Sequence, residues 1–421
     1  MNKKIGNLFK GDKVIWMVFF FLCIISVIEV FSASSTLTYA TGYYLGPITK
    51  HMGMLIAAIA LAIIVLNVPC KYFKLLTPAL LVVSFATLLW VLIGGESING
   101  ANRVIKLAGF TFQPSEIAKG TMVLVTAQIL SATQVESGAD KDAFKYILWI
   151  LLPMAFLIGL ENLSTAGLLC IVIFIMMFLG RVPLQQLGKL LGVVAVLAVF
   201  GITFIMVAGK VDEDKKAEKA TTEITGNKKT DEGFFDKMFH RAGTWKGRVN
   251  SFFEPEPAPE DYDLDRGKQV AHANIAITSS NIIGKGPGNS TERDFLPQAY
   301  SDFIYAIVIE EMGIVGAVAV VFLYIVLLFR AARIASRCEN NFPAFLVMGL
   351  ALLLVIQATF NMLVAVGLAP VTGQPLPLIS RGGTSTIING AYIGAILSVS
   401  RSAKKQKEPS ANKKAVVAEE A

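Results

Sequence analysis

The sequence predicts an all-α polytopic membrane protein with about ten transmembrane helices. Of its 421 residues, 54% are hydrophobic and 16% are charged, whereas a soluble chain carries roughly 25% charged residues. The apolar residues lie in long blocks, and a block such as 14–30 is long enough to cross a hydrocarbon core about 30 Å thick as a helix. The bilayer is therefore the expected solvent for most of the chain.

The apolar blocks are separated by polar segments whose charges predict the topology. Lys and Arg gather at every second junction, and the positive-inside rule then places both termini in the cytoplasm. The first block is too long for the apolar core of a cleaved signal peptide and is expected to remain as a helix. The blocks span residues 14–34, 51–68, 74–94, 114–133, 146–161, 164–180, 185–208, 302–330, 343–366 and 384–402.

The domain organisation follows from this topology. Residues 1–402 form the predicted membrane domain, in which 209–301 is a large extracytoplasmic loop between the seventh and eighth helices. Within this loop, 211–233 is rich in Lys, Glu, Asp and Thr and is expected to be disordered, because it has almost no large apolar side chains to bury. The polar tail 403–421 is expected to be a disordered cytoplasmic segment.

Charge and metal-ligand patterns exclude two other classes of function. The formal net charge is +7, but the basic residues lie at the ends of apolar blocks, where they orient helices rather than bind nucleic acid. The 4 Cys and 3 His residues are scattered, and none forms a pair with metal-ligand spacing. No metal-ligating residues are predicted.

The first motif that can carry chemistry is the segment 113–119, which opens the fourth block. Pro114 suits the first turn of a helix, and Glu116 and Lys119 lie on one helical face. A helix start with a neutralising ion pair explains the pattern. A role in function is the alternative, because ionisable residues in transmembrane helices usually face a cavity or a partner.

The second motif is the glycine-rich segment 284–290, followed by 295–303. Glycines allow backbone N–H groups to approach a phosphate, although most such segments are simple turns. Asp302 opens the eighth block, where it is either a helix cap or a general base at the membrane surface. Glu310 and Glu311 lie one to two turns deeper, and a structural network and catalysis are both open for them.

The third motif is the proline- and glycine-rich segment 367–385 between the ninth and tenth blocks. Its composition excludes a regular helix. Irregular backbone at membrane depth is tolerated where it is buried in protein or lines a cavity, so an ordered re-entrant loop is expected here.

Together these motifs resemble the SEDS family of shape, elongation, division and sporulation proteins, which includes FtsW, RodA and SpoVE. The resemblance is carried by Gln-Pro-Ser-Glu at 113–116, by the Leu-Pro and Asp-Phe pairs within 296–303 and by 370–377, and it extends over nearly the whole chain. It implies an inverting peptidoglycan glycosyltransferase that polymerises lipid II at the outer face of the cytoplasmic (inner) membrane and releases undecaprenyl pyrophosphate.

The resemblance also implies roles for individual residues. Asp302 would be the base that activates the acceptor hydroxyl, and the basic side chains would hold the pyrophosphate. It leaves open whether a divalent cation, Mg²⁺ or Mn²⁺, assists. The implied partners are a class B penicillin-binding protein and other division-complex proteins, with no nucleic acid. The implied substrate-binding residues are Arg103, Lys119, Glu116, Gln113, Arg248, Ser380 and Pro375.

The alternatives to this interpretation are distinguishable. Gly11-Asp12-Lys13 and the loop pattern favour the division branch, FtsW, acting at the septum, over the elongation branch, RodA. A lipid II flippase or other transporter would be expected to show internal repeats, and none is evident. A non-enzymatic scaffold would not need Asp302. Leu378, Arg381 and Glu161-Asn162 depart from the usual family pattern.

Overall fold

The computed structural model describes residues 9–33, 46–94, 96–98, 101–107, 110–136, 138–196, 203, 268–296 and 299–405. The chain divides into two units, which are treated separately: Met1–Pro183, Gln269–Val366 and Thr372–Ala421 form the first, and Leu184–Lys268 and Gly367–Val371 form the second. The predicted disorder of 211–233 and of 406–421 lies outside the described residues.

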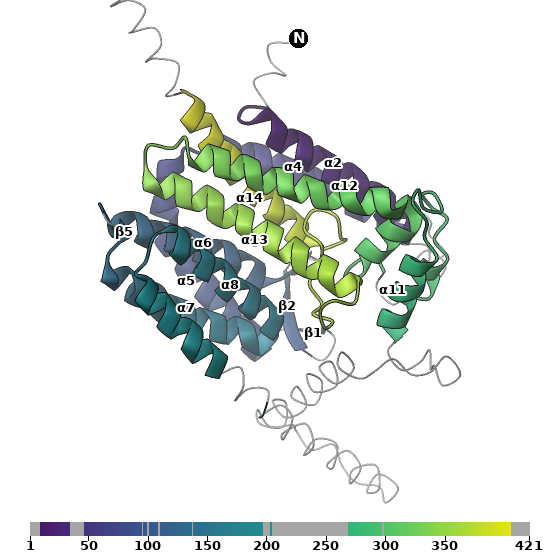
Figure 1. Ribbon diagram of the computed structural model, residues 1–421, viewed down its shortest axis with the longest axis horizontal. Helices are drawn as coiled ribbons and strands as arrows, with labels where there is room; N and C mark the ends of the chain where they lie inside the picture. Colours follow the sequence, from purple (N-terminus) through teal and green to yellow (C-terminus); the bar gives the residue numbers. More distant parts are fainter. Residues whose placement is uncertain are drawn as a thin grey trace, which may run out of the picture. The chain divides into compact units, whose positions relative to one another are not determined.

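The first unit is built from long α-helices (Figure 1). The described part of the second unit contains the helix Leu184–Val196. The remaining helices are α2 (Lys13–Ala33), α4 (Gly46–Asn67), α5 (Cys70–Gly94), α6 (Pro114–Ala132), α7 (Lys141–Glu161), α8 (Leu163–Leu179), α11 (Lys268–Thr278), α12 (Ile304–Ala335), α13 (Asn341–Ala365) and α14 (Thr384–Lys405).

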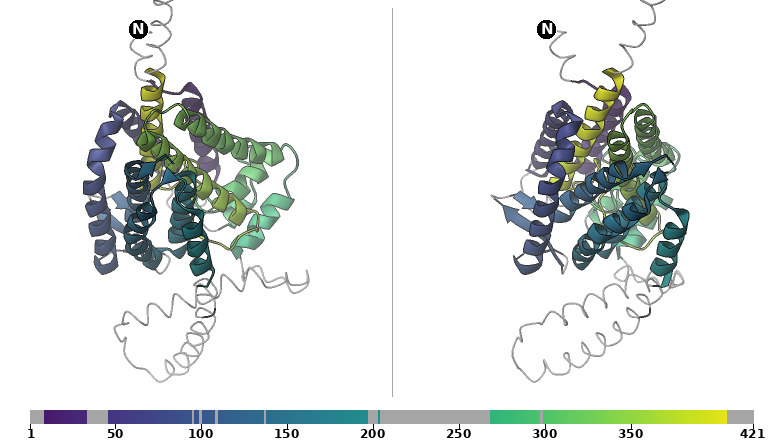
Figure 2. Two further views of the ribbon diagram at one scale, coloured as in Figure 1. Left: turned by 60° about the vertical axis from the view of Figure 1, so that its left-hand side comes forward. Right: turned by 90° about the vertical axis from the view of Figure 1, so that its left-hand side faces the viewer.

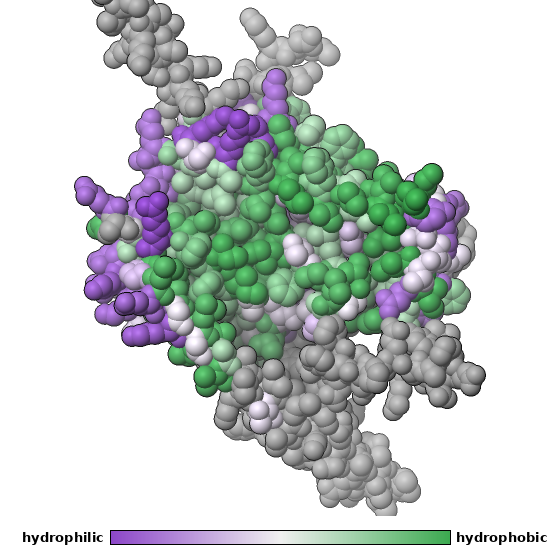
Figure 3. Space-filling view, viewed as in Figure 1, coloured by the Kyte–Doolittle hydropathy of each residue, from purple (hydrophilic) through white to green (hydrophobic). Residues whose placement is uncertain are grey.

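Over its described residues, each predicted apolar block coincides with one of these helices, the seventh block as far as Val196. Among the described residues, six helices are long and apolar enough to cross a membrane: α2, α4, α5, α7, α12 and α13. That all ten cross stays a prediction. On the face shown in Figure 3, hydrophobic residues cover the middle of the helices and hydrophilic residues gather near their ends. Large apolar side chains such as Ile93 and Trp149 are exposed in the structure, as a lipid-facing surface requires.

Close helix packing depends on small residues. Helix α14 lies along α4 (Figure 2). A Cβ atom at Gly390 would lie 2.5 Å from the carbonyl oxygen of Ala58, and one at Gly394 would lie 2.6 Å from that of Ala62. Small residues of this kind let helix backbones approach closely inside a membrane.

The segments that join the helices contain short strands, which the sequence did not predict. Strands β1 (Glu96–Ile98), β2 (Ala101–Leu107) and β3 (Phe110–Phe112) form an antiparallel sheet between α5 and α6. Strands β4 (Gln134–Val135) and β5 (Gly138–Ala139) pair between α6 and α7. The predicted division at Glu161-Asn162 is confirmed, because Asn162 ends α7 and its side chain accepts the N–H of Ser164 at the start of α8.

Helix α12 is interrupted at Gly313, where the backbone adopts φ 68° and ψ −168°. The N–H groups of Ile314 and Val315 donate to the carbonyl oxygens of Asn281 and Ile282 instead of to their own helix. The residues just before the glycine-rich segment therefore fill the gap in the helix, so the break leaves these polar groups satisfied within the protein.

Replacing Gly313 with Ala tests this break. The new Cβ would lie 2.4 Å from the carbonyl oxygen of Ile282, at a φ that disfavours side chains. We expect Gly313→Ala to lower the free energy of unfolding by about 1–3 kcal/mol, measured by thermal unfolding in detergent. Gly167→Ala is the matched control, because a Cβ there meets nothing within 4 Å. Equal melting temperatures for the two variants would contradict the proposed fit.

Candidate active site

The loop between α13 and α14, which we call the re-entrant loop after its predicted position in the membrane, is ordered: residues 372–381 are largely buried without regular secondary structure. Its depth in the membrane stays a prediction. Side chains from the surrounding helices donate to its carbonyl oxygens. Ser26 Oγ of α2 donates to Ile379 over 2.6 Å, and Gln357 Nε2 of α13 donates to Pro375 over 3.1 Å. Tyr324 of α12 donates to Pro377. The loop is thus held by donors from separate helices, as irregular backbone at this depth requires.

Asp302 lies in the turn before α12, and the loop holds its backbone. The carbonyl oxygen of Tyr300 accepts the N–H of Arg381 over 2.9 Å, and that of Ser301 accepts Ser380 Oγ over 2.5 Å. The carbonyl oxygen of Asp302 itself accepts Asn361 Nδ2 over 2.8 Å. Three consecutive carbonyl groups are therefore bonded to the loop and α13, and we call this arrangement the carbonyl clamp.

The cap position of α12 belongs to Phe303, whose side chain makes no capping hydrogen bond. Asp302 Oδ1 accepts the hydroxyl of Ser301 over 3.0 Å, and the residue is partly exposed. Asp302 therefore directly precedes the cap position instead of occupying it, and its role as a general base stays a prediction.

Glu116 and Lys119 form the ion pair that their spacing predicted, with Lys119 Nζ 2.8 Å from Glu116 Oε1. Lys119 is 0% exposed, and its Nζ also donates to Gln357 Oε1 over 2.7 Å. Gln357 in turn donates to the carbonyl oxygen of Pro375. The ion pair therefore stabilises the re-entrant loop through Gln357. Contact between Lys119 and a pyrophosphate stays a prediction.

The glycine-rich segment surrounds two carboxylates of the protein itself. Gly288 N–H donates to Glu311 Oε2 over 2.9 Å, and Thr291 N–H donates to Glu310 Oε1 over 3.0 Å. Lys285 Nζ lies 2.6 Å from Glu310 Oε1. Both glutamates are fully buried. The structural-network interpretation of Glu310 and Glu311 is therefore confirmed, and these backbone N–H groups bind carboxylate rather than phosphate.

The other predicted site residues are placed as follows. Ser380 and Pro375 belong to the re-entrant loop, and Gln113 precedes α6, where its Nε2 donates to Ser115 Oγ over 3.1 Å. Arg103 lies in β2, but its side chain is outside the described residues, as is all of Arg248. The structure joins Asp302, Ser380, Pro375, Lys119 and Glu116 through one hydrogen-bonded network.

Two residues of this network were missed in the sequence. Asn361 donates both to Asp302 and, over 2.7 Å, to the carbonyl oxygen of Gln374, and Gln357 connects Lys119 to the loop. The sequence feature that could have identified them is the presence of two amide side chains one turn apart within the apolar block 343–366. Polar side chains at such positions in a membrane helix hydrogen-bond across helices.

Comparison with known proteins gives consistent matches over almost the whole chain. The model of the FtsW/RodA/SpoVE family, described as "Cell cycle protein", matches residues 12–405. The probable peptidoglycan glycosyltransferase FtsW of Geobacter sp. (strain M18) is 28% identical over 92% of this chain and 96% of its own length. The peptidoglycan glycosyltransferase MrdB of Escherichia coli (strain K12) is 26% identical over 92% of this chain and 93% of its own length.

Solved structures share the fold. A chain from a structure describing coordination of polymerization and crosslinking by a peptidoglycan synthase complex gives a TM-score of 0.67 at 22% identity, covering 93% of this chain and 98% of that one. The rod shape determining protein RodA of Thermus thermophilus gives a TM-score of 0.61 at 21% identity, covering 94% of this chain and 98% of that one.

Removing one member of the buried ion pair tests its supporting role. Lys119→Met leaves Glu116 without its cation, and we expect the free energy of unfolding to fall by about 3–5 kcal/mol. Glu116→Gln combined with Lys119→Met should recover much of this loss, because no unpaired charge remains. Thermal unfolding of both variants measures the difference. A stable Lys119→Met protein that has lost activity would instead assign Lys119 to the substrate.

Proposed function

The chain belongs to the FtsW/RodA/SpoVE family of cell cycle proteins, the SEDS family, and we propose that it polymerises lipid II at the outer face of the cytoplasmic membrane. It is a multi-pass membrane protein and a peptidoglycan glycosyltransferase, as its curated relatives are. In the proposed reaction the growing glycan is extended and undecaprenyl pyrophosphate leaves.

The carbonyl clamp is the observation that supports Asp302 as the catalytic base. A general base must be held within hydrogen-bonding reach of the proton that it removes. The clamp fixes the backbone of Asp302 through Arg381, Ser380 and Asn361, while Oδ1 accepts the hydroxyl of Ser301 and the residue is partly exposed. A partly exposed carboxylate on a backbone held in this way suits the role.

The proposed step is a single displacement. Asp302 takes the proton of the acceptor sugar's 4-hydroxyl, and the hydroxyl oxygen forms a bond to the anomeric carbon of the donor. The bond from that carbon to the pyrophosphate oxygen breaks, so the electron pair leaves with undecaprenyl pyrophosphate and the configuration inverts. The leaving group gains negative charge, and guanidinium groups stabilise such charge well.

The pyrophosphate is proposed to contact Arg103, Arg248 and Lys119, as the family resemblance implies. Arg381 is a further cation beside the clamp, because its guanidinium carbon lies 5.2 Å from the ring centroid of Tyr300. Gln113, Glu116, Ser380 and Pro375 are proposed to shape the same site.

The finer assignment is to cell division at the septum, with a class B penicillin-binding protein as the transpeptidase partner. Curated relatives include both FtsW and MrdB at similar identity, so this assignment rests on the amino-terminal and loop patterns of the sequence. A related solved chain comes from a complex that couples polymerization and crosslinking, which supports a partner enzyme for this chain.

Asp302→Asn tests the proposed base. The amide keeps the size of the side chain but cannot accept the acceptor's proton, so lipid II polymerisation by the purified protein with its cognate class B partner should fall by at least about 10²-fold. Asp294→Asn, the same change at the exposed last residue of the 3₁₀ turn Glu292–Asp294, is the matched control. Membrane insertion and partner binding are measured in parallel. Full activity of a folded, partner-bound Asp302→Asn protein would remove the residue from this role.

Asn361→Leu tests the clamp as a positioning device. The variant loses the bonds to Asp302 and Gln374, so the base should be less well placed and kcat should fall about 10²-fold with little change in KM. Asn361→Gln keeps an amide donor and should restore part of the rate. Thr359→Val, on the exposed face of the same helix, is the control. If Asn361→Leu lowers thermal stability but leaves kcat unchanged, the role of Asn361 is purely structural.

A further inference from the structure

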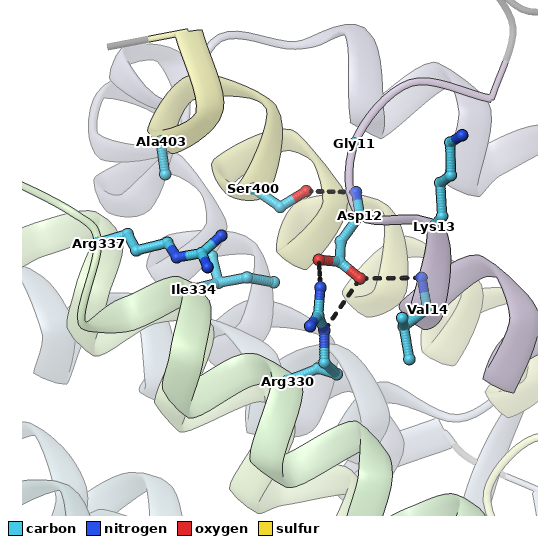
Figure 4. Close-up of a pocket in the computed structure, with 9 residues that line it drawn as sticks. All are labelled: Gly11, Asp12, Lys13, Val14, Arg330, Ile334, Arg337, Ser400 and Ala403. Carbon is cyan, nitrogen blue, oxygen red and sulfur yellow. Dashed lines mark hydrogen bonds and ion pairs between the residues drawn. The ribbon is translucent and has the colours of Figure 1, made fainter. Parts of the chain in front are cut away.

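A cavity of about 270 Å³ lies where α2 begins and where α12 and α14 end (Figure 4). It is far from Asp302, since α12 starts beside Asp302 and runs 32 residues to this end. At about 1.5 Å per residue, that length spans a bilayer. Both polar and apolar side chains line the cavity, among them Asp12, Val14, Arg330, Ile334, Arg337 and Ser400.

The carboxylate of Asp12 is already fully engaged. Arg330 donates to both of its oxygens, through Nε to Oδ1 over 3.3 Å and through Nη2 to Oδ2. Oδ1 also accepts the N–H groups of Val14 and Ile15, over 2.9 and 3.2 Å, as the cap of α2. Ser400 Oγ accepts the backbone N–H of Asp12 over 2.9 Å. This acidic group therefore neutralises one arginine and the helix end, and nothing more.

Arg337 brings a second positive charge to the same cavity. Its guanidinium extends toward Arg330 in Figure 4, while the ammonium of Lys13 points away. Within the described part of the chain, no carboxylate forms an ion pair with Arg337. Two guanidinium groups thus converge on one cavity that holds a single, already bonded carboxylate, which leaves a site of net positive charge.

We propose that this cavity binds the phosphate headgroup of an anionic phospholipid. Arg337 and the remaining Nη1 of Arg330 would donate to the phosphate oxygens, since guanidinium and phosphate match in geometry and charge. Val14, Ile334 and Ala403 supply apolar lining that suits the glycerol and the first acyl carbons. Basic pockets between helix ends on the cytoplasmic side bind such headgroups, and the charge pattern predicts that this end is cytoplasmic.

The apolar lining and the location distinguish a lipid from a free anion. A soluble phosphate would gain nothing from Val14, Ile334 and Ala403, and it would compete with the lipid headgroups at the ends of membrane helices. A bound lipid would connect the ends of α2, α12 and α14. Because it binds the folded state alone, it would raise thermal stability in proportion to its occupancy.

The test uses the full-length protein in phosphatidylcholine nanodiscs with increasing phosphatidylglycerol. Native mass spectrometry counts the bound lipids, and the melting temperature reports stabilisation. We expect a phosphatidylglycerol-dependent rise in melting temperature, with affinity at least about tenfold weaker in Arg337→Gln because one charged hydrogen-bonding group is lost. Arg333→Gln is the matched control, because Arg333 is exposed in the last turn of α12, four residues before Arg337, and does not line the cavity.

Further arms separate the outcomes. Arg337→Lys keeps the charge and should retain most of the effect, which excludes a folding defect as the cause. An equal response of Arg333→Gln and Arg337→Gln would overturn the assignment to this cavity. A stabilisation by inorganic phosphate or glycerol 3-phosphate as large as that by phosphatidylglycerol would overturn the assignment to a lipid. Absence of any phosphatidylglycerol effect on the wild-type protein would overturn the proposal as a whole.

Discussion

Backbone polar groups inside a membrane protein must find their partners within the protein, and this constraint determines the structure around Asp302. The re-entrant loop cannot satisfy its own carbonyl groups, so Ser26, Gln357 and Tyr324 donate to them from three helices. The loop in turn donates through Ser380 and Arg381 to the turn that carries Asp302. The position of the proposed base is therefore set by the packing of the helix bundle rather than by the turn itself.

Buried charges also stabilise the structure around the carbonyl clamp. The ion pair of Glu116 and Lys119 is connected to the loop through Gln357, and Glu310 and Glu311 lie within α12, more than two turns beyond Asp302. A buried ion pair adds little stability compared with apolar packing, but breaking it is costly. We infer that these charges specify one arrangement of loop and helix. The interruption at Gly313 gives the glycine-rich segment access to the two glutamates.

Much of the fold was predictable, because apolar blocks and helix boundaries are local features. The described residues of the ten blocks lie in helices, the division at Asn162 is a helix cap, and the loop after α13 is ordered and buried without regular secondary structure. The partners of the polar groups were not predictable. Ser26 and Ile379 are 353 residues apart, and no local pattern connects them. The glycine-rich segment suggested a binding site for an anion such as phosphate. In the structure, backbone N–H groups in and beside this segment bind the carboxylates of Glu310 and Glu311.

The central claim is that the loop and α13 act together on the backbone at Asp302. A double-mutant cycle tests it most directly, with single-turnover lipid II polymerisation measured for Ser380→Ala, Asn361→Leu and the combination. Both side chains hold adjacent carbonyl groups, so the account predicts that the double variant loses clearly less than the product of the two single losses. Fully multiplicative losses, in variants that fold and bind their partner as the wild type does, would contradict it.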